Sequence, residues 1–560
     1  MCYPKTWITE PINQFPAVDF VLKTFLTGYV VPIPVLREGS KAMKTLNYIQ
    51  ILLVVICLAF VASRLAAQNP ATGGQNKPGT ANPSKSEDTV KDEHATIGVE
   101  SKPSAATHTL HPDAQWYPDA GLGLFLHWGI SSVKGMNISW PMIPGRPLAQ
   151  KKLTAEERER VTRESDYNLD GKPLQITPNE YWTMAASFNP QKYDPDKWLK
   201  AARAAGFTYV VLTARHHEGF ALWPTAYGNF NTKNFMGGRD LLKPYVDACR
   251  RNGLKVGFYY SPPDWYFDRD YMNFLYGGGA RNNPELTPLG PDLKPRTSQR
   301  SDAERKKHQA EYAALVRGQV EELLTRYGKI DLLWFDGKPA VPDPTNVITI
   351  ERIHELQPGI VVNPRLHNKG DYVTYERRLT TDKVATGWAE FCNTWTNSWP
   401  HVNGARFRSN GFILGQFVTS RSLGINYLLG VGPMATGEFT PEIYQNMAVV
   451  ADWMKHNGRS IKGTKPLSTN ETASVPATAS SSARYLFALA QFKNDSMYDD
   501  DMLPLSEGTL TLKGVSKPVT VKLVGDGTAL KYDYADNMVT IQLPASKRTK
   551  LVDVVEVKLR

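Results

Sequence analysis

The sequence predicts an α/β protein, with a (β/α)8-like barrel over residues 108–466 followed by a small all-β sandwich over residues 467–560. Three observations predict this. In the first range, apolar strand-like runs alternate with amphipathic helical stretches, an order typical of a parallel sheet closed into a barrel. Several of these runs end on polar side chains. In the second range, short alternating or β-branched runs follow one another without helices, which favours an antiparallel sandwich. For the first domain, an open doubly wound sheet is the alternative.

The expected barrel strands are continuous apolar runs, because strands buried on both faces of a parallel sheet carry few polar residues. They lie at residues 123–128, 209–214, 254–260, 330–336, 360–363 and 411–417. The intervening amphipathic stretches predict helices at residues 196–205, 240–252, 304–327 and 346–356. Strands of the second domain are expected at residues 484–492, 508–512, 519–524, 538–543 and 551–559.

Residues 1–107 are expected to lie outside both domains. Lys44, the apolar stretch 49–62 and the small residues after it predict a signal peptide over residues 43–67, with residues 1–42 as an upstream false start. An apolar core of about 14 residues is shorter than the roughly 20 needed to span a bilayer. We therefore expect an exported protein, periplasmic or extracellular, with no stable membrane insertion after cleavage. Residues 68–107, rich in Pro, Gly and Ser, predict a disordered linker.

Composition excludes some classes of protein. The net charge of +10 is spread over 560 residues without a dense Lys/Arg block, so no nucleic-acid partner is expected. Only Cys249 and Cys392 follow the predicted leader; they could form one disulfide, and their spacing is not that of a metal site. The charged, proline-rich stretch at 136–178 predicts a long loop that shapes substrate access. The sequence does not predict the oligomeric state.

Polar groups follow several of the predicted strands. The run at 330–336 ends on Asp336, and barrel enzymes carry their catalytic groups at the carboxyl ends of strands. Asp336 is therefore the candidate nucleophile. Three further runs deliver other polar groups to the same rim, namely His127, the pair His216 and His217, and the pair Tyr259 and Tyr260. Adjacent residues of a regular strand point to opposite faces, which argues against joint metal ligation by the two neighbouring histidines.

Several motifs in this order resemble those of the retaining α-L-fucosidases of glycoside hydrolase family 29. The matching segments are GLFLHWG within residues 122–129, the block 187–224 that contains HHEGF, GLKVGFYYSPPDW at 253–265, DLLWFDG at 331–337 and NYLLGVGP at 426–433. The resemblance implies an exo-acting enzyme that removes terminal α-L-fucose from a fucosylated glycan or oligosaccharide. No metal or other cofactor is implied.

The resemblance also implies a double displacement in which Asp336 forms a covalent fucosyl-enzyme and a second carboxyl group, about 5–5.5 Å away, acts as acid and then as base. GDYVTYE ends on Glu376 and resembles the family segment GDY-x-TPE, with Tyr in place of Pro. AEFCNT contains Glu390 and resembles WE-x-C-x-T, with Ala in place of Trp. Glu376 is preferred as the acid/base, and Glu390 is the alternative.

Binding roles follow from the same resemblance. His127, His216 and His217 are expected to bond the sugar hydroxyls, and Tyr259 or Tyr260 to lie near the nucleophile. Arg365 is expected to reach the sugar or an acidic partner. Fucose carries a methyl group at C5 in place of a hydroxymethyl group, which calls for an apolar wall. The candidates for this wall are Trp334, Phe335, Trp399 and Trp140.

Three other functions remain open at this stage. One is an α-L-galactosidase-like enzyme, which would need a wider or more polar site at C6. A second is a catalytically inactive carbohydrate-binding protein, which the departures at Tyr375 and Ala389 keep open. The third is a metal-dependent hydrolase using His216, His217 and Asp336, although these residues lack a familiar ligand spacing.

Overall fold

The computed structural model describes residues 93–99, 107–143, 176–274, 288–296 and 298–560. The expected upstream segment, the signal peptide and most of the linker lie outside the described residues, and so does most of the 136–178 loop. The residues described belong to one structural unit, Gln75–Arg560.

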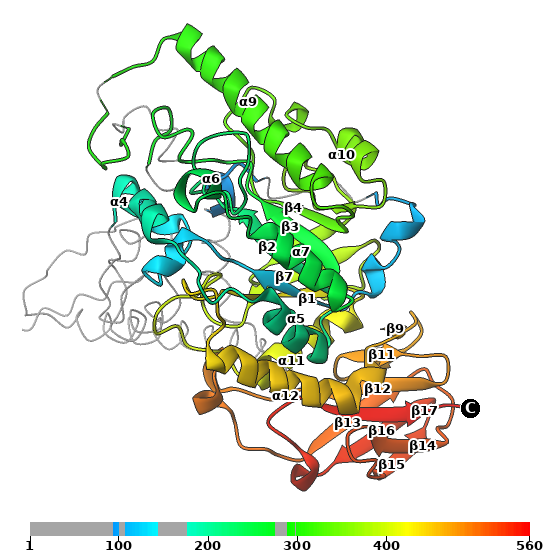
Figure 1. Cartoon of the computed structure of the whole chain (residues 1–560). Coiled ribbons are helices and arrows are strands. Elements are labelled where there is room, and N and C mark those ends of the chain that lie inside the picture. Colours follow the sequence, from blue (N-terminus) through cyan, green and yellow to red (C-terminus); the bar gives the residue numbers. More distant parts are fainter. Residues whose placement is uncertain (1–92, 100–106, 144–175, 275–287, 297) are drawn as a thin grey trace, which may run out of the picture. The chain divides into compact units, whose positions relative to one another are not determined.

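Eight parallel strands form the central sheet (Figure 1), in the order β5-β4-β3-β2-β1-β8-β7-β6. Their bounds are β1 Leu122–Leu126, β2 Tyr209–Arg215, β3 Lys255–Tyr260, β4 Leu332–Phe335, β5 Val361–Val362, β6 Val373–Glu376, β7 Ala389–Thr394 and β8 Asn426–Val431. The sheet curls so that its edges β5 and β6 meet through Asp371. The backbone N–H of Asp371 donates to the Val362 carbonyl at 2.8 Å, and its carboxylate accepts from the Val362 N–H at 2.7 Å. The predicted barrel fold is confirmed.

Helices cover the outside of the sheet (Figure 1). They are α4 Pro178–Thr183, α5 Pro195–Ala204, α6 Thr232–Phe235, α7 Leu242–Arg251, α9 Asp302–Thr325, α10 Ile350–Leu356, α11 Asn410–Ser422 and α12 Pro441–Asn457. Local sequence sets several of their starts. A capping box of Ser301 and Glu304 begins α9, and the Asp194 side chain accepts hydrogen bonds from the first turn of α5.

One predicted strand is wrong, because residues 411–417 belong to helix α11. Ser409 caps this helix through a hydrogen bond from the Gly411 N–H at 3.1 Å. The run shows no helical period because the helix packs both against β8 and against the C-terminal strand β11, Ala477–Ala479. A short apolar run buried on several sides cannot be assigned to helix or strand from periodicity. Three barrel strands were not predicted, namely β6, β7 and β8.

Alternation along the barrel strands separates two apolar layers. In β4, Leu332 and Trp334 face the barrel interior, whereas Leu333 and Phe335 face the surrounding helices. The interior layer contains, among others, Tyr117, Phe125, Tyr209, Val211, Tyr259, Tyr372, Cys392, Trp399 and Leu428. The next inward position after Trp334 is 336, so the strand period itself directs Asp336 into the barrel.

Two antiparallel sheets follow the barrel. The four-stranded sheet has the order β10 Thr472–Ala473, β13 Gly508–Lys513, β16 Met538–Leu543 and β15 Tyr532–Ala535. The five-stranded sheet has the order β14 Thr520–Leu523, β17 Asp553–Lys558, β12 Ala483–Ala488, β11 and β9 Lys465–Pro466. One apolar cluster joins them, with Val539 and Ile541 of β16 packing with Val555 and Val557 of β17. These sheets form a β-sandwich.

The sandwich is attached to the barrel through α12, which lies beside β12 and β17 in Figure 1. The indole N–H of Trp453 on α12 donates to the Val552 carbonyl at 2.7 Å.

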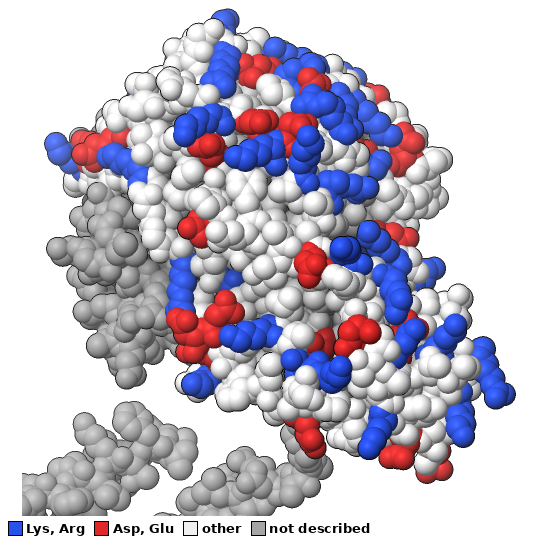
Figure 2. Space-filling model, turned by 60° about the horizontal axis from the view of Figure 1, so that its bottom comes forward, with Lys and Arg blue, Asp and Glu red and all other residues white. Residues whose placement is uncertain are grey.

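Cys249 and Cys392 are both buried and unbonded, so the disulfide that the sequence allowed is not formed. No helix among the described residues has the length and hydropathy needed to cross a bilayer. On the face in Figure 2, basic and acidic side chains are interspersed.

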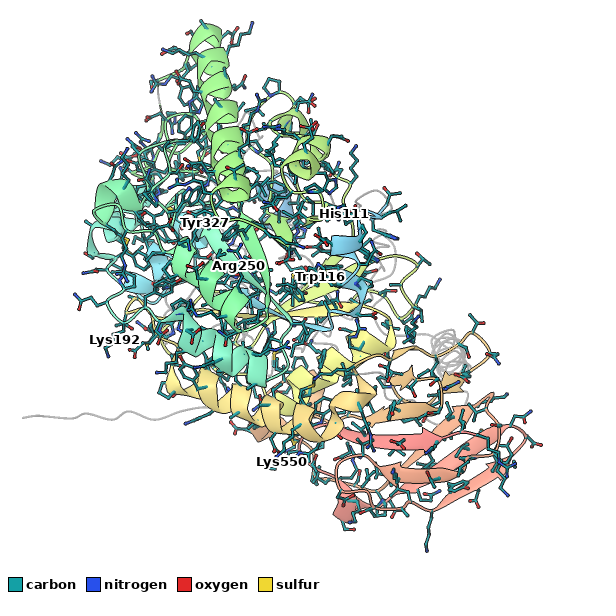
Figure 3. The ribbon with its side chains drawn as sticks, turned by 45° about the vertical axis from the view of Figure 1, so that its right-hand side comes forward. His111, Trp116, Lys192, Arg250, Tyr327 and Lys550 are labelled. Atoms are coloured by element: carbon teal, nitrogen blue, oxygen red, sulfur yellow. The ribbon has the colours of Figure 1, made fainter. Side chains whose placement is uncertain are left out.

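The amino end of the barrel lies opposite the carboxyl rim that carries Asp336. Figure 3 labels His111 and Trp116 on the segment before β1, Arg250 on α7 and Tyr327 just after α9. The Arg250 guanidinium donates to the carbonyl oxygens of Tyr327 and Lys329. These contacts join the end of α7 to the turn that follows α9.

Candidate active site

Asp336 lies immediately after β4 at the carboxyl end of the barrel. Tyr259 lies near the carboxyl end of β3 and faces the barrel interior. Its phenol donates a hydrogen bond of 2.7 Å to Oδ2 of Asp336. Nε2 of His217 lies 3.6 Å from the same oxygen. The residue is only 8% exposed. A carboxylate held this firmly and this far from bulk water has a fixed orientation, which a nucleophile requires.

Arg365 bridges Asp336 and Glu376. Its Nη1 donates to Oδ1 of Asp336 at 2.8 Å, and its Nη2 donates to Oε2 of Glu376 at 2.5 Å. The guanidinium lies over the Trp334 ring, with 4.5 Å from Cζ to the ring centroid. Although burial lowers the pKa of Arg365, the two carboxylates raise it above its ordinary value. A permanent cation therefore stands between two carboxyl groups from different strands.

Glu376 ends strand β6 and faces the barrel interior. Burial alone would raise the pKa of this carboxyl group, but the charge of Arg365 and the hydrogen bond from His94 at 3.0 Å lower it further than burial raises it. Its pKa consequently lies well below its usual range. The carboxylate form is favoured in the unliganded site.

Glu390 lies deeper in the barrel than Glu376. Strand register pairs Thr374 with Glu390 and Glu376 with Cys392, so Glu390 sits two residues, or about 7 Å, toward the amino end. Its oxygens accept hydrogen bonds from three buried side chains, Trp334 at 2.9 Å, Tyr209 at 2.8 Å and Tyr117 at 3.2 Å. Burial raises its pKa. This geometry makes Glu390 a support for the ring on which Arg365 rests and favours Glu376 as the partner of Asp336.

His216 is oriented by Ser139. The Ser139 hydroxyl donates its proton to Oε2 of Glu218 at 2.5 Å, so Oγ of Ser139 accepts the proton of Nδ1 of His216 at 2.7 Å. This assignment leaves Nε2 of a neutral His216 as a hydrogen-bond acceptor. Ser139 adopts a left-handed backbone conformation, with φ of +61°, which is uncommon for serine and places its hydroxyl between the two side chains.

His217 is oriented in the same way by Ser261. The Ser261 hydroxyl donates to the Pro263 carbonyl at 2.7 Å and accepts from Nδ1 of His217 at 2.6 Å. Nε2 of His217 therefore faces Asp336 as an acceptor when the ring is neutral. Both histidines lie beyond the regular part of β2, in the turn after Arg215, so strict alternation no longer separates their side chains. Their ring centroids are 4.1 Å apart.

His127 and Trp399 complete the cluster. The His127 ring lies 5.0 Å from the Trp399 ring and 5.9 Å from the His216 ring, measured between centroids. Among the described residues, Nδ1 of His127 has no hydrogen-bond partner although it is buried. Burial, followed by the nearby His216, lowers the pKa of His127 well below its ordinary value. A neutral, unsatisfied imidazole next to an indole face suits a sugar that offers both hydroxyls and apolar hydrogens.

Tyr260 does not join this cluster, which corrects the expectation that either tyrosine could stand near the nucleophile. Like Phe258, Tyr260 faces the layer of helices outside the barrel, and its phenol donates to Gln319 of α9 at 3.0 Å. The guanidinium of Arg215 lies over its ring at 4.4 Å. Alternation along β3 thus selects Tyr259 for the interior and Tyr260 for the helix layer.

Comparison with known proteins agrees with this arrangement. The family model described as alpha-L-fucosidase matches residues 90–459. The chain belongs to the alpha-L-fucosidase family. Human tissue alpha-L-fucosidase is 26% identical over 426 residues, which cover 72% of this chain and 81% of that protein. An alpha-L-fucosidase of Branchiostoma floridae is 26% identical over 462 residues, 79% of this chain and 91% of its own length.

Solved structures of fucosidases share the fold. Alpha-L-fucosidase isoenzyme 1 of Paenibacillus thiaminolyticus aligns with a TM-score of 0.61 at 26% identity, covering 80% of this chain and 99% of that one. A family 29 alpha-L-fucosidase of Bacteroides thetaiotaomicron aligns with a TM-score of 0.60 at 22% identity, covering 82% and 98%. This member of the fucosidase family is therefore a glycoside hydrolase with the barrel of its relatives.

The same cluster offers ligands to a metal ion. Ligand atoms of His216, His217 and Asp336 lie within 4.8 Å of one another. However, Oδ1 of Asp336 is bound to the Arg365 cation and Oδ2 to the Tyr259 phenol. A dication placed there would meet an adjacent guanidinium in a buried site, which is unfavourable. In this fucosidase the arrangement fits hydrogen bonding to a neutral sugar better than metal ligation.

Four residues that contact the site were not anticipated, namely His94, Ser139, Glu218 and Ser261. Ser261 directly follows the predicted strand 254–260, and Glu218 lies four residues after the predicted strand 209–214, so their positions were a signal that could have been used. Ser139 and His94 come from irregular segments far from the strands in sequence, and no local pattern identifies them. Residues 93–99 also differ from the expected disordered linker, because Ile97 is 4% exposed and belongs to the main apolar core.

Proposed function

We propose that this protein is an exo-acting α-L-fucosidase that hydrolyses terminal α-L-fucose from glycans or oligosaccharides with retention at the anomeric carbon. The observation that carries the proposal is the bridge of Arg365 between Asp336 and Glu376. Two carboxyl groups that flank one bond are the machinery of glycoside hydrolysis. Both are nearly closed off from solvent, which suits a single terminal sugar rather than the middle of a long chain.

In the first step, Asp336 attacks the anomeric carbon while the bond to the glycosidic oxygen breaks. Glu376 protonates that oxygen, and a covalent fucosyl-enzyme remains. Because Arg365 favours the carboxylate form of Glu376 in the unliganded site, Glu376 must take up a proton before this step. The charge on Asp336 is lost as the new bond forms.

In the second step, Glu376 as a carboxylate removes a proton from water, which attacks the anomeric carbon and releases Asp336. Tyr259 and Arg365 donate to Asp336 and stabilise the returning negative charge. Two displacements on opposite faces give net retention. A solved structure of the Bacteroides thetaiotaomicron relative is described as a trapped covalent intermediate with 2-fluoro-fucosyl fluoride, which supports this order of events.

Sugar recognition follows from the orientation of the histidines. Nε2 of His216 and Nδ1 of His127 are available to fucose hydroxyl groups, and His217 lies beside His216 with its Nε2 atom facing Asp336. Trp399 lies against His127, and Trp140 lies 5.5 Å from the His217 ring. These indoles supply apolar surface for the methyl group, which an α-L-galactoside would replace with a hydroxymethyl group.

We also propose that the protein is exported, with the leader at residues 43–67 removed. This proposal is supported by the sequence pattern alone, namely Lys44, the apolar stretch 49–62 and the small residues that follow. Amino-terminal sequencing of protein recovered from the periplasm or culture medium tests this. A mature chain that still begins before residue 68 would contradict it.

A direct assay tests the catalytic proposal. Purified protein is incubated with an aryl α-L-fucoside and, separately, an aryl α-L-galactoside, each with and without chelator. Release from the fucoside should exceed release from the galactoside and be insensitive to chelator. Asp336→Ala should reduce turnover by at least about a thousandfold while leaving the circular dichroism spectrum unchanged. Full activity in Asp336→Ala would refute the assignment of the nucleophile, and binding without turnover by the unaltered protein would favour a carbohydrate-binding role.

A further inference from the structure

Residues 93–99 form a short segment, here called the amino-terminal strap, that lies against the nucleophile loop. Residues 93–96 make one helical turn, closed by a hydrogen bond of 3.2 Å from the Ile97 N–H to the Glu93 carbonyl, and the Val99 N–H then donates to the His94 carbonyl at 2.8 Å. The Ile97 carbonyl then accepts the Lys338 N–H at 2.8 Å. Lys338 is two residues beyond Asp336, so the strap is joined to the backbone that carries the nucleophile.

The strap is docked by packing as well as by this hydrogen bond. Ile97 is buried in the main apolar core, and burial of such a side chain stabilises the docked form by about 2 kcal/mol. Close approach requires glycine at position 337, because a Cβ there would lie 2.7 Å from the Ile97 carbonyl oxygen. Gly337 also has φ of +91°, a conformation that suits glycine. The strap is thus an integral part of the carboxyl rim.

His94 projects from the strap onto Glu376. Its Nε2 atom lies 3.0 Å from Oε2, the oxygen that also accepts from Arg365. Among the described residues, no group bonds Oε1 of Glu376. Two donors from separate segments, His94 of the strap and Arg365 of the loop before β6, therefore bind one oxygen of the Glu376 carboxyl group. Its other oxygen is left for substrate. The His94 side chain is 19% exposed and Glu376 is 7% exposed, so His94 is the outer member of the pair.

We propose that His94 is a positioning residue for the acid/base Glu376, supplied by the amino-terminal strap. It acts by fixing the rotation of the carboxyl group, so that the unbound oxygen faces the glycosidic oxygen. A misplacement of about 1 Å in such a group can cost on the order of a hundredfold in rate. This inference rests on the assignment of Glu376 proposed above.

Leaving-group dependence separates positioning from general stabilisation. Fluoride departs with little protonation, whereas the sugar hydroxyl of a fucosyl disaccharide needs it. In His94→Ala, kcat/KM should fall about tenfold or more on the disaccharide and stay within about twofold on α-L-fucosyl fluoride. His94→Gln, which keeps a donor at a similar reach, should recover most of the loss. His111→Ala is the matched control, since His111 also precedes β1 but only caps the turn at Asp113.

A double variant provides the decisive comparison. If His94 acts through Glu376, adding His94→Ala to Glu376→Ala should cause no further loss on the disaccharide. Equal losses on both substrates, or additive losses in the double variant, would overturn the inference and leave His94 a structural residue. If Glu376→Ala itself spares the disaccharide, the acid/base assignment fails. If Glu376→Ala shows the loss and His94→Ala does not, only the role of His94 fails. Thermal unfolding of each variant checks that the strap change leaves the fold intact.

Discussion

The phenol of Tyr259 donates to Oδ2 of Asp336 at 2.7 Å, and strand alternation alone separates it from its neighbour Tyr260. Arg365 donates to the other oxygen, Oδ1, so Tyr259 and Arg365 each bind one oxygen of the Asp336 carboxylate. Because these donors bind the free carboxylate, they stabilise Asp336 most when it is expelled from the covalent intermediate. This relationship sets different expectations for the two chemical steps.

Tyr259→Phe should slow the second step more than the first. Loss of a hydrogen bond to a charged group costs about 1.5–3 kcal/mol, so kcat on an activated aryl fucoside should fall roughly 10- to 100-fold, with a smaller change in kcat/KM. Rapid-mixing measurements should then reveal a burst of aryl alcohol. Tyr260→Phe is the control and should show no burst, because its phenol bonds Gln319 outside the barrel.

Glu376→Ala should behave as an acid/base variant and Glu390→Ala should not. An activated aryl leaving group needs little protonation, so the Glu376 variant should accumulate fucosyl-enzyme that azide can intercept. Product analysis for fucosyl azide and the azide dependence of kcat test this. Rescue seen with Glu390→Ala alone would exchange the two roles, despite the deeper position of Glu390 in the barrel.

Glu390→Gln should change the pH dependence of stability. Burial raises the pKa of Glu390 in the folded protein, so the folded state binds this proton more tightly than the unfolded state does. Its contribution to stability is present below the unfolded pKa of about 4.3 and is lost as the pH rises through the folded pKa. The free energy of unfolding should therefore fall less between pH 4.5 and 7 in the variant. Denaturant titrations at several pH values measure this, and parallel curves for both proteins would contradict it.

Gly337→Ala should release the amino-terminal strap. The added Cβ would meet the Ile97 carbonyl oxygen and Pro263 Cγ, each at 2.7 Å, in addition to the cost of φ at +91°. We expect a destabilisation of about 1–3 kcal/mol and faster hydrogen exchange at residues 93–99. Gly463→Ala is the matched control, since Gly463 also has positive φ, at +68°, but no atom lies within 4 Å of its Cβ position. Equal losses in the two variants would mean that the strap contact contributes nothing.

Much of the fold followed from patterns within single segments. Asp336 could be placed because an apolar run of buried-strand type ends on it, and the helix at Asp302–Thr325 begins at a capping box readable from Ser301 and Glu304. The segment at residues 411–417 could not be assigned, because burial by β8 and by the second domain removed its period. Strand β7 was missed for a related reason, since Glu390 and Asn393 interrupt its apolar pattern yet both point to partners inside the protein.

By itself, the sequence determined the barrel with its β-sandwich, the motifs of the fucosidase family, and the carboxylate at the end of β4, because strand period and strand ends are local properties of the chain. Only the tertiary structure decided which of two glutamates stands beside Arg365, which of two tyrosines faces Asp336, and that His94 reaches Glu376. These choices depend on register between strands and on contacts across 282 positions of sequence. Such contacts are set by how the barrel closes, and no window of neighbouring residues contains them.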